Sequence, residues 1–278
     1  MGIGTVLGRS NTPSLHNMAA KVFQLSLLAI LETTSPRAWA FALIGIYEYL
    51  QRFAGDRRVT QVQEELASRL LVLYQNNSVD GWNWFEDKLT YCNAALSHAM
   101  LLSGESIADP AMTTVGLESL NWLADLQRSD TEGKHFVPIG SNGFYQQGGE
   151  RARFDQQPVE AQAMVSACLE AHRITRDKKW HQEVRRAFEW FLGRNDLHLP
   201  IYDPTTGGCR DGLHPDRTNE NQGAESTLAF LQSLLELRLA ENIMEPNEHN
   251  HNEHPAFGNI SSSQTQPDLD SLKLAVSS

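Results

Sequence analysis

Apolar residues recur at three- and four-residue intervals along most of the chain, which is the spacing of helices with one buried face. Almost no segment alternates with the two-residue period of a strand for more than four residues. The pattern therefore predicts an all-α protein, with no sheet of more than two or three short strands. The expected helices span 15–31, 36–53, 57–75, 90–102, 110–128, 158–175, 178–192 and 221–240.

Residues with known positional preferences mark the expected helix ends. Pro36 and Pro110 stand where proline is favoured, in the first turn of a helix. Asp56 is a typical N-cap residue because its carboxylate accepts hydrogen bonds from free backbone N–H groups. Gly104 and Gly193 are expected to end the helices that precede them.

A repeat relates four of the helices. Residues 157–161 and 222–226 lie 65 positions apart, and a further step of 65 from Pro158 reaches Asn93 at another expected helix start. The helices near 36–53, 91–102, 157–174 and 221–239 thus occupy equivalent places, each preceded by another helix. Such a period predicts antiparallel helical hairpins arranged as an incomplete or complete (α/α) toroid. The long loops 79–89, 134–156 and 197–220 precede equivalent helices, so functional residues are expected on one rim.

The composition changes near residue 241. We expect a domain over 1–241 and a disordered acidic tail over 242–278, because the tail is too polar to bury apolar area. The formal net charge is −11, and residues 241–278 contain six acids and one base. Both parts are acidic, which argues against binding to duplex nucleic acid, because that requires a basic face.

Cysteines and hydropathy favour a cytoplasmic protein. The three cysteines, Cys92, Cys168 and Cys209, form neither a disulfide framework nor a zinc site by their spacing. The apolar stretch 22–31 is about half of the ~20 residues that a membrane-spanning helix needs. No histidine pair within the helices has metal-ligand spacing, and we expect no cofactor, no metal and no membrane span.

Three loop clusters are candidates for chemistry. In 81–87, Trp82 and Trp84 could stack on sugar rings while Glu86 and Asp87 accept hydroxyl hydrogen bonds; alternatively, the tryptophans fill the core. In 148–160, Asp155 or Glu160 could act as acid or base; alternatively, arginine–carboxylate pairs hold the loop in place.

The third cluster contains glycines, amides and charges over 203–226. Glu225 stands at the position equivalent to Glu160, and two carboxylates converging on one pocket are typical of glycoside hydrolysis. The alternative is that both acids are favoured only by the positive ends of helix dipoles.

The sequence resembles a bacterial group with six-hairpin glycosidase-like domains, found C-terminal to or beside group 1 glycosyltransferases. The similarity covers about residues 3–240. It implies an (α/α) toroid, a carbohydrate-related role and a possible glycosyltransferase partner. The strings that carry it are Ser35-Pro36-Arg37-Ala38-Trp39-Ala40, Trp84-Phe85-Glu86-Asp87, Arg151-Ala152-Arg153-Phe154-Asp155-Gln156-Gln157-Pro158-Val159-Glu160-Ala161 and Asn221-Gln222-Gly223-Ala224-Glu225-Ser226-Thr227.

Two departures from the group bear on activity. Residues 2–9 read as the end of a helix, which suggests an N-terminally truncated member whose N-terminal edge could associate with a partner or a second copy. Cys92 stands where relatives are expected to carry an acid.

Our leading hypothesis is a carbohydrate-active domain that binds a glycan; if it is an enzyme, hydrolysis is the expected reaction. The alternatives are a non-catalytic module that binds glycans or a glycosyltransferase, and a sugar epimerase, which would need a well-placed histidine base. The candidate acids and bases are Glu86, Asp87, Asp155, Glu160 and Glu225; the candidate binding residues are Trp82, Trp84, Tyr145, Arg151, Arg153, Gln157, Arg210, Asp211, Asn221 and Gln222.

Overall fold

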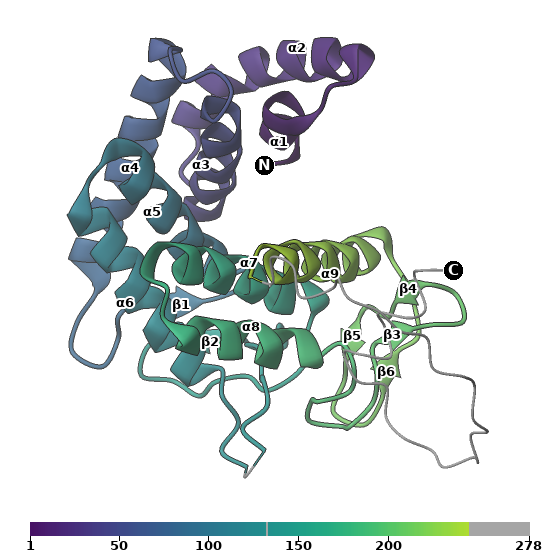
Figure 1. Ribbon diagram of the computed structural model, residues 1–278. Coiled ribbons are helices and arrows are strands. Elements are labelled where there is room, and N and C mark those ends of the chain that lie inside the picture. The colour runs from purple at the N-terminus through teal and green to yellow at the C-terminus, as the bar shows by residue number, and fades with distance from the viewer. Residues whose placement is uncertain (132, 245–278) are drawn as a thin grey trace.

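The computed structural model describes residues 1–131 and 133–244, and this part of the chain is predominantly helical (Figure 1). The all-α class predicted from the sequence is confirmed. The α-helices are α1 (Gly2–Arg9), α2 (Pro13–Ala29), α3 (Pro36–Leu50), α4 (Arg57–Asn77), α5 (Ala94–Ile107), α6 (Pro110–Leu126), α7 (Pro158–Thr175), α8 (Lys178–Glu189) and α9 (Ala224–Met244). A 3-10 turn, η1 (Ile30–Glu32), follows α2.

The helices form two layers. In the inner layer α1 packs on α3, α3 on α5, α5 on α7 and α7 on α9, while α2, α4, α6 and α8 each pack on their inner partners. Residues of all five inner helices line one cavity, so the inner row is concave on that side. The long loops precede α5, α7 and α9 and lie at the end of the row where these helices begin, which we call the rim.

Local capping explains where several helices start. The Ser35 hydroxyl accepts a hydrogen bond from the Ala38 amide, and the Asp56 carboxylate accepts from the amides of Arg58 and Val59. Asp109 caps α6 in the same way. These side chains satisfy amides that have no partner within the helix, so the predicted starts agree with the structure.

Several predicted boundaries differ from the structure. Helix α5 starts at Ala94 instead of residue 90, and α8 ends at Glu189 instead of residue 192. Helix α5 continues through Gly104 to Ile107 and ends at Ala108, which adopts a left-handed conformation. Gly104 packs directly against Thr113 of α6, where a Cβ atom would overlap the neighbouring chain, so this glycine serves helix packing. Helix α9 starts at Ala224 instead of residue 221, and it runs to Met244, beyond the expected domain end at 241. The expected tail over 245–278 lies outside the described residues.

Short strand pairs join the rim loops. Strand β1 (Lys88–Leu89) pairs with β2 (Tyr145–Gln146), β3 (Tyr202–Asp203) with β4 (Gly208–Cys209), and β5 (Gly212–Leu213) with β6 (Thr218–Asn219). All three pairs are antiparallel. No sheet among the described residues has more than two strands, which agrees with the expectation of no sheet of more than two or three short strands. The β1–β2 pair and a bridge between Gln156 and Leu213 connect successive loops, so the rim is a continuous structure.

Helices α2 and α9 each leave several large apolar residues exposed. On α2, the side chain of Leu25 is 70% exposed, and on α9 that of Leu235 is 59% exposed. The segment Pro13–Glu32 is also long and apolar enough to cross a membrane by length and composition alone, a criterion that core helices and signal sequences meet too. The exposed residues are Leu15, Met18, Val22, Leu25 and Leu28 on α2, and Leu228, Leu231, Leu235 and Leu239 on α9.

Candidate functional site

Arg37, in the first turn of α3, links the rim ends of two inner helices. Arg37 is only 5% exposed. The guanidinium donates to Glu86 Oε2 at 2.5 Å, to the Tyr91 carbonyl oxygen at 2.6 Å and to Asn93 Oδ1 at 3.1 Å. These partners neutralise and fix a buried charge, and they place Glu86 in an ion pair.

Glu160 continues this network into α7. Its residue is 3% exposed, and its carboxylate accepts from the Cys92 amide, from Asn93 Nδ2 at 3.0 Å and from the Asn93 amide at 3.4 Å. Burial raises the pKa of Glu160 to about 7, although these three donors favour the charged form. Glu160 therefore joins the beginning of α7 to the beginning of α5.

Glu225 lies in the first turn of α9 and is exposed. Burial raises the pKa of the Cys92 thiol, and the nearby charges of Glu160 and Glu225 raise it further. Both predicted acids lie in the first turn of an inner helix, Glu160 in α7 and Glu225 in α9. They differ in environment, since one is buried and hydrogen-bonded while the other faces solvent.

The other candidate acids also have partners. Asp155 Oδ1 lies 2.6 Å from Nδ1 of His214, and Asp87 Oδ2 accepts from Gln146 Nε2 at 3.1 Å. No metal-ligating cluster of three or more side chains occurs within the described residues.

The candidate arginines of the second loop hold backbone and buried charge. Arg153 pairs with Asp196 through two hydrogen bonds of 2.9 and 2.7 Å, and His135 reaches the same carboxylate at 2.7 Å. These contacts lower the pKa of Asp196 despite its burial, which by itself raises it. Arg151 donates to the Leu126 carbonyl at the end of α6. Gln157 is half-buried and directly precedes α7.

The residues of the third loop shape the start of α9. Asp211 accepts from the Gly223 amide at 2.9 Å, from Ser226 Oγ at 2.6 Å and from the Asn221 side chain. Arg210 pairs with Glu220 at 3.0 Å, while Gln222 donates to Asp203. The loop is therefore fixed by internal hydrogen bonds.

The two tryptophans proposed as sugar-stacking platforms are buried. Trp84 is 0% exposed and Trp82 is 4% exposed. The indole N–H of Trp82 donates to the Glu86 carbonyl oxygen at 2.8 Å. Tyr145 packs its edge on Trp82. The stacking role is thus wrong for the tryptophans in this structure, because their ring faces contact protein. The alternative interpretation, that they fill the core beneath the loop, agrees with their position.

Unlike the two tryptophans, Tyr91 has an exposed aromatic ring, and it lies three residues before the start of α5. It is 48% exposed, and the guanidinium carbon of Arg37 lies 5.4 Å from its ring centroid. Tyr91 was not among the residues predicted from the sequence, although it directly precedes Cys92 and Asn93 at a repeat position.

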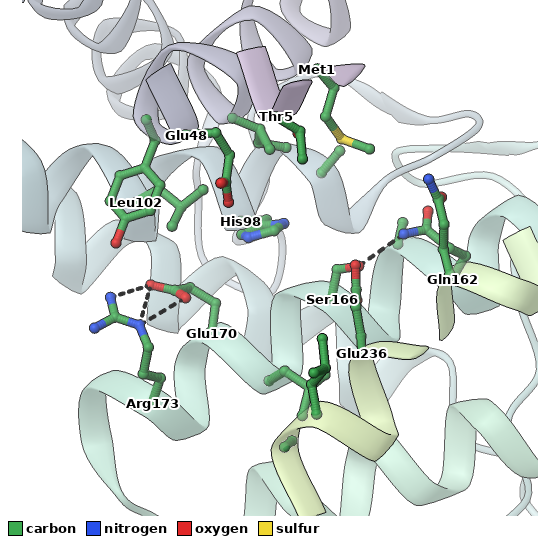
Figure 2. Close-up of a pocket in the computed structure, with 18 of the residues that line it drawn as sticks. Met1, Thr5, Glu48, His98, Leu102, Gln162, Ser166, Glu170, Arg173 and Glu236 are labelled. Atoms are coloured by element: carbon green, nitrogen blue, oxygen red, sulfur yellow. Dashed lines mark hydrogen bonds and ion pairs between the residues drawn. The ribbon is translucent and has the colours of Figure 1, made fainter. Parts of the chain in front are cut away.

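A cavity of about 540 Å³ lies on the concave side of the inner row (Figure 2). It is lined by residues of α1, α3, α5, α7 and α9, including Glu48, His98, Ser166 and Glu236. None of these four residues was among the candidate site residues predicted from the sequence. Their signal is weak in sequence because they come from four different helices and share no motif or spacing.

No family model and no curated protein matches this chain in the searches that were made.

Proposed function

We propose that this chain is a carbohydrate-binding domain on an (α/α) toroid scaffold, with its binding surface at the rim. The observation that carries the proposal is the pairing of the rim carboxylates. Glu160 accepts hydrogen bonds from the beginning of α5, Glu86 pairs with Arg37 and Asp155 pairs with His214. These acids stabilise the rim, so recognition falls to the groups that remain exposed.

The same pairing favours binding over hydrolysis. Glycoside hydrolysis uses two carboxyl groups about 5–10 Å apart, with the scissile bond between them in an open cleft. Glu160 is buried, and its oxygens accept three hydrogen bonds. Glu225 is exposed, so it would lack Glu160 as the second carboxyl group that hydrolysis requires. A hydrolase that uses the Glu160–Glu225 pair is the second candidate function.

The exposed groups suit a glycan. Aromatic rings pack on the apolar faces of pyranoses, and the Tyr91 ring is half-exposed at the beginning of α5. Carboxylates accept hydrogen bonds from hydroxyl groups, and Glu225 is exposed near the same place. A glycosyltransferase that handles the same glycan is the partner class that we propose for this surface.

The first test is binding of the whole chain to a glycan array, followed by calorimetry on the best oligosaccharide. We expect Tyr91→Ala and Glu225→Gln each to weaken binding about tenfold or more, which corresponds to ~1.4 kcal/mol. Glu64→Gln is the matched control, because Glu64 is an exposed acid on the outer helix α4.

Two results would decide against the proposal. Equal glycan binding by the wild type and both rim variants would place recognition elsewhere. The other result is that the wild type releases reducing ends from the glycan and that Glu225→Gln and Glu160→Gln each abolish this release. It would favour the hydrolase over the binding module.

A further inference from the structure

The cavity contains a polar cluster built by four inner helices. Glu48 comes from α3, His98 from α5, Ser166 from α7 and Glu236 from α9, and all four line the cavity. Figure 2 shows Glu48 and His98 facing each other across its upper part. None of these residues belongs to the rim network, so the cluster is a separate feature.

His98 has unused hydrogen-bonding capacity. Neither of its ring nitrogens bonds to any residue in the described part of the chain, although the side chain is largely enclosed. Burial lowers the pKa of His98 to about 4, although the charge of Glu48 raises it, so the imidazole is neutral near pH 7. A neutral imidazole offers one donor and one acceptor. Both are available to a ligand in the cavity.

Glu236 and Ser166 form a short chain of hydrogen bonds. Gln162 Nε2 donates to Ser166 Oγ at 2.8 Å, and Ser166 donates to Glu236 Oε2 at 2.5 Å. The other Glu236 oxygen has no hydrogen bond to a residue that the structure describes. Burial raises the pKa of Glu236. This carboxyl group is thus oriented, with one oxygen still available.

The charges around the cavity balance. Glu48 pairs with Arg9 at 2.5 Å, and Glu170 pairs with Arg173 at 2.6 Å. With Arg176 and Glu236, the lining contains three arginines and three glutamates. Among these side chains neither sign of charge is in excess, and burial lowers the pKa of the Met1 α-amino group that also lines the cavity. The lining therefore favours a neutral ligand over one of high net charge.

The remaining wall is apolar and the space has the size of a small-molecule site. Phe41, Ile44, Leu102 and Leu169 supply apolar surface next to the polar cluster. The volume of about 540 Å³ falls within the ~300–1,000 Å³ of typical ligand pockets. A few convergent polar groups on an apolar wall suit a ring that has apolar faces and several hydroxyl groups.

We propose that this cavity binds one neutral cyclic polyol, of the size of a monosaccharide. One hydroxyl group of the ring accepts a hydrogen bond from His98, and a second hydroxyl group donates one to His98. A third hydroxyl group donates to the available oxygen of Glu236. This second site goes beyond the rim surface proposed above, and its ligand class follows from its own residues.

The test uses the full chain with ¹⁵N-labelled histidine, in which NMR reports the two His98 ring nitrogens directly. The probes are glucose, galactose, mannose, N-acetylglucosamine and myo-inositol. We expect at least one to shift both nitrogen signals in a saturable way. Ser166→Ala should weaken that probe's binding at least tenfold, because Glu236 loses the donor that orients it. Tyr91→Ala should leave it unchanged.

Three outcomes would overturn the cavity site. The first is that no probe shifts the His98 signals saturably. The second is unchanged affinity in Ser166→Ala and also in His98→Gln, which provides a second variant if the first does not fold. The third is a change of the His98 signals with protein concentration alone, because a second copy would then fill the cavity. Glycan binding that Tyr91→Ala leaves unchanged, with the cavity titration intact, would refute the rim proposal alone.

Discussion

Glu160 and Glu225 occupy equivalent places in successive hairpins, yet one is buried and the other exposed. The neighbouring inner helix explains the difference. Glu160 accepts from the amides of Cys92 and Asn93, which begin α5. The residue 65 positions after Asn93 is Pro158, which has no backbone N–H to donate. The beginning of α7 therefore lacks one of the donors that hold Glu160 in place, and Glu225 turns to solvent.

The raised pKa of Glu160 makes stability depend on pH. Folded Glu160 keeps its proton up to about pH 7, whereas the unfolded chain releases it near pH 4.5. Stability from this group is thus complete below pH 4.5 and is lost progressively as pH rises to about 7. We expect the wild type to lose about 3 kcal/mol more than Glu160→Gln between pH 5 and pH 8 in urea unfolding.

Glu225→Gln is the control for this measurement, since Glu225 is exposed. It should show the same pH dependence as the wild type. A wild-type profile that coincides with that of Glu160→Gln would mean that Glu160 is already ionised at pH 5, held by its three donors.

The chemistry of individual residues was predicted only in part. The sequence placed Glu160 and Glu225 on one rim because both begin equivalent helices. It did not predict that Arg37, 49 positions before Glu86, would pair with that acid. Partners of this kind come from tertiary packing, which local patterns do not encode. Trp84 was misassigned for the same reason, since a loop tryptophan can face either solvent or core.

Helix ends were predicted well where a local cap decides them and poorly where packing does. Pro36, Pro110 and Pro158 each stand in the first turn of a helix, as expected. Gly104 reads as a helix end in sequence, but its lack of a side chain lets α6 approach α5. A glycine has both uses, and only the position of the neighbouring helix distinguishes them.

Glycines also set the distance between α1 and α3. A Cβ atom on Gly4 would overlap the Gly45 carbonyl, and one on Gly8 would overlap the Glu48 carbonyl. We expect Gly4→Ala to displace α1 and to remove hydrogen-exchange protection from its amides. The overpacking should cost about 1–3 kcal/mol.

Gly2→Ala is the matched control, because a Cβ atom on Gly2 meets nothing within 4 Å. It should leave the protection of α1 unchanged. Equal protection in both variants would show that α1 does not dock closely on α3 in solution.

For the molecule as a whole, the repeat predicted a row of hairpins, but not which surfaces would be covered. The exposed apolar residues of α2 repeat at positions 15, 18, 22 and 25, a spacing that suits packing against another helix. Monomeric proteins rarely expose large contiguous apolar patches. We therefore propose self-association through the N-terminal edge.

Sedimentation velocity at increasing protein concentration tests this without lipid. We expect concentration-dependent association in the wild type and its loss in Leu25→Glu, which places a charge in the centre of the apolar face. Gln24→Glu adds the same charge at an exposed polar position and should still associate. A wild type that stays monomeric throughout would refute the association.

The hydrogen bonds from Arg37 to Asn93 and from Asn93 to Glu160 cross three inner helices in succession. In a simple array of repeats, each unit contacts only its neighbours, and the ends can fray one hairpin at a time. Displacing Asn93 with α5 would remove one hydrogen-bond partner from Arg37 and two donors from Glu160 at the same time. Helices α3, α5 and α7 should therefore behave as one cooperative unit, while α1 and α2, outside this chain of contacts, are free to unfold independently.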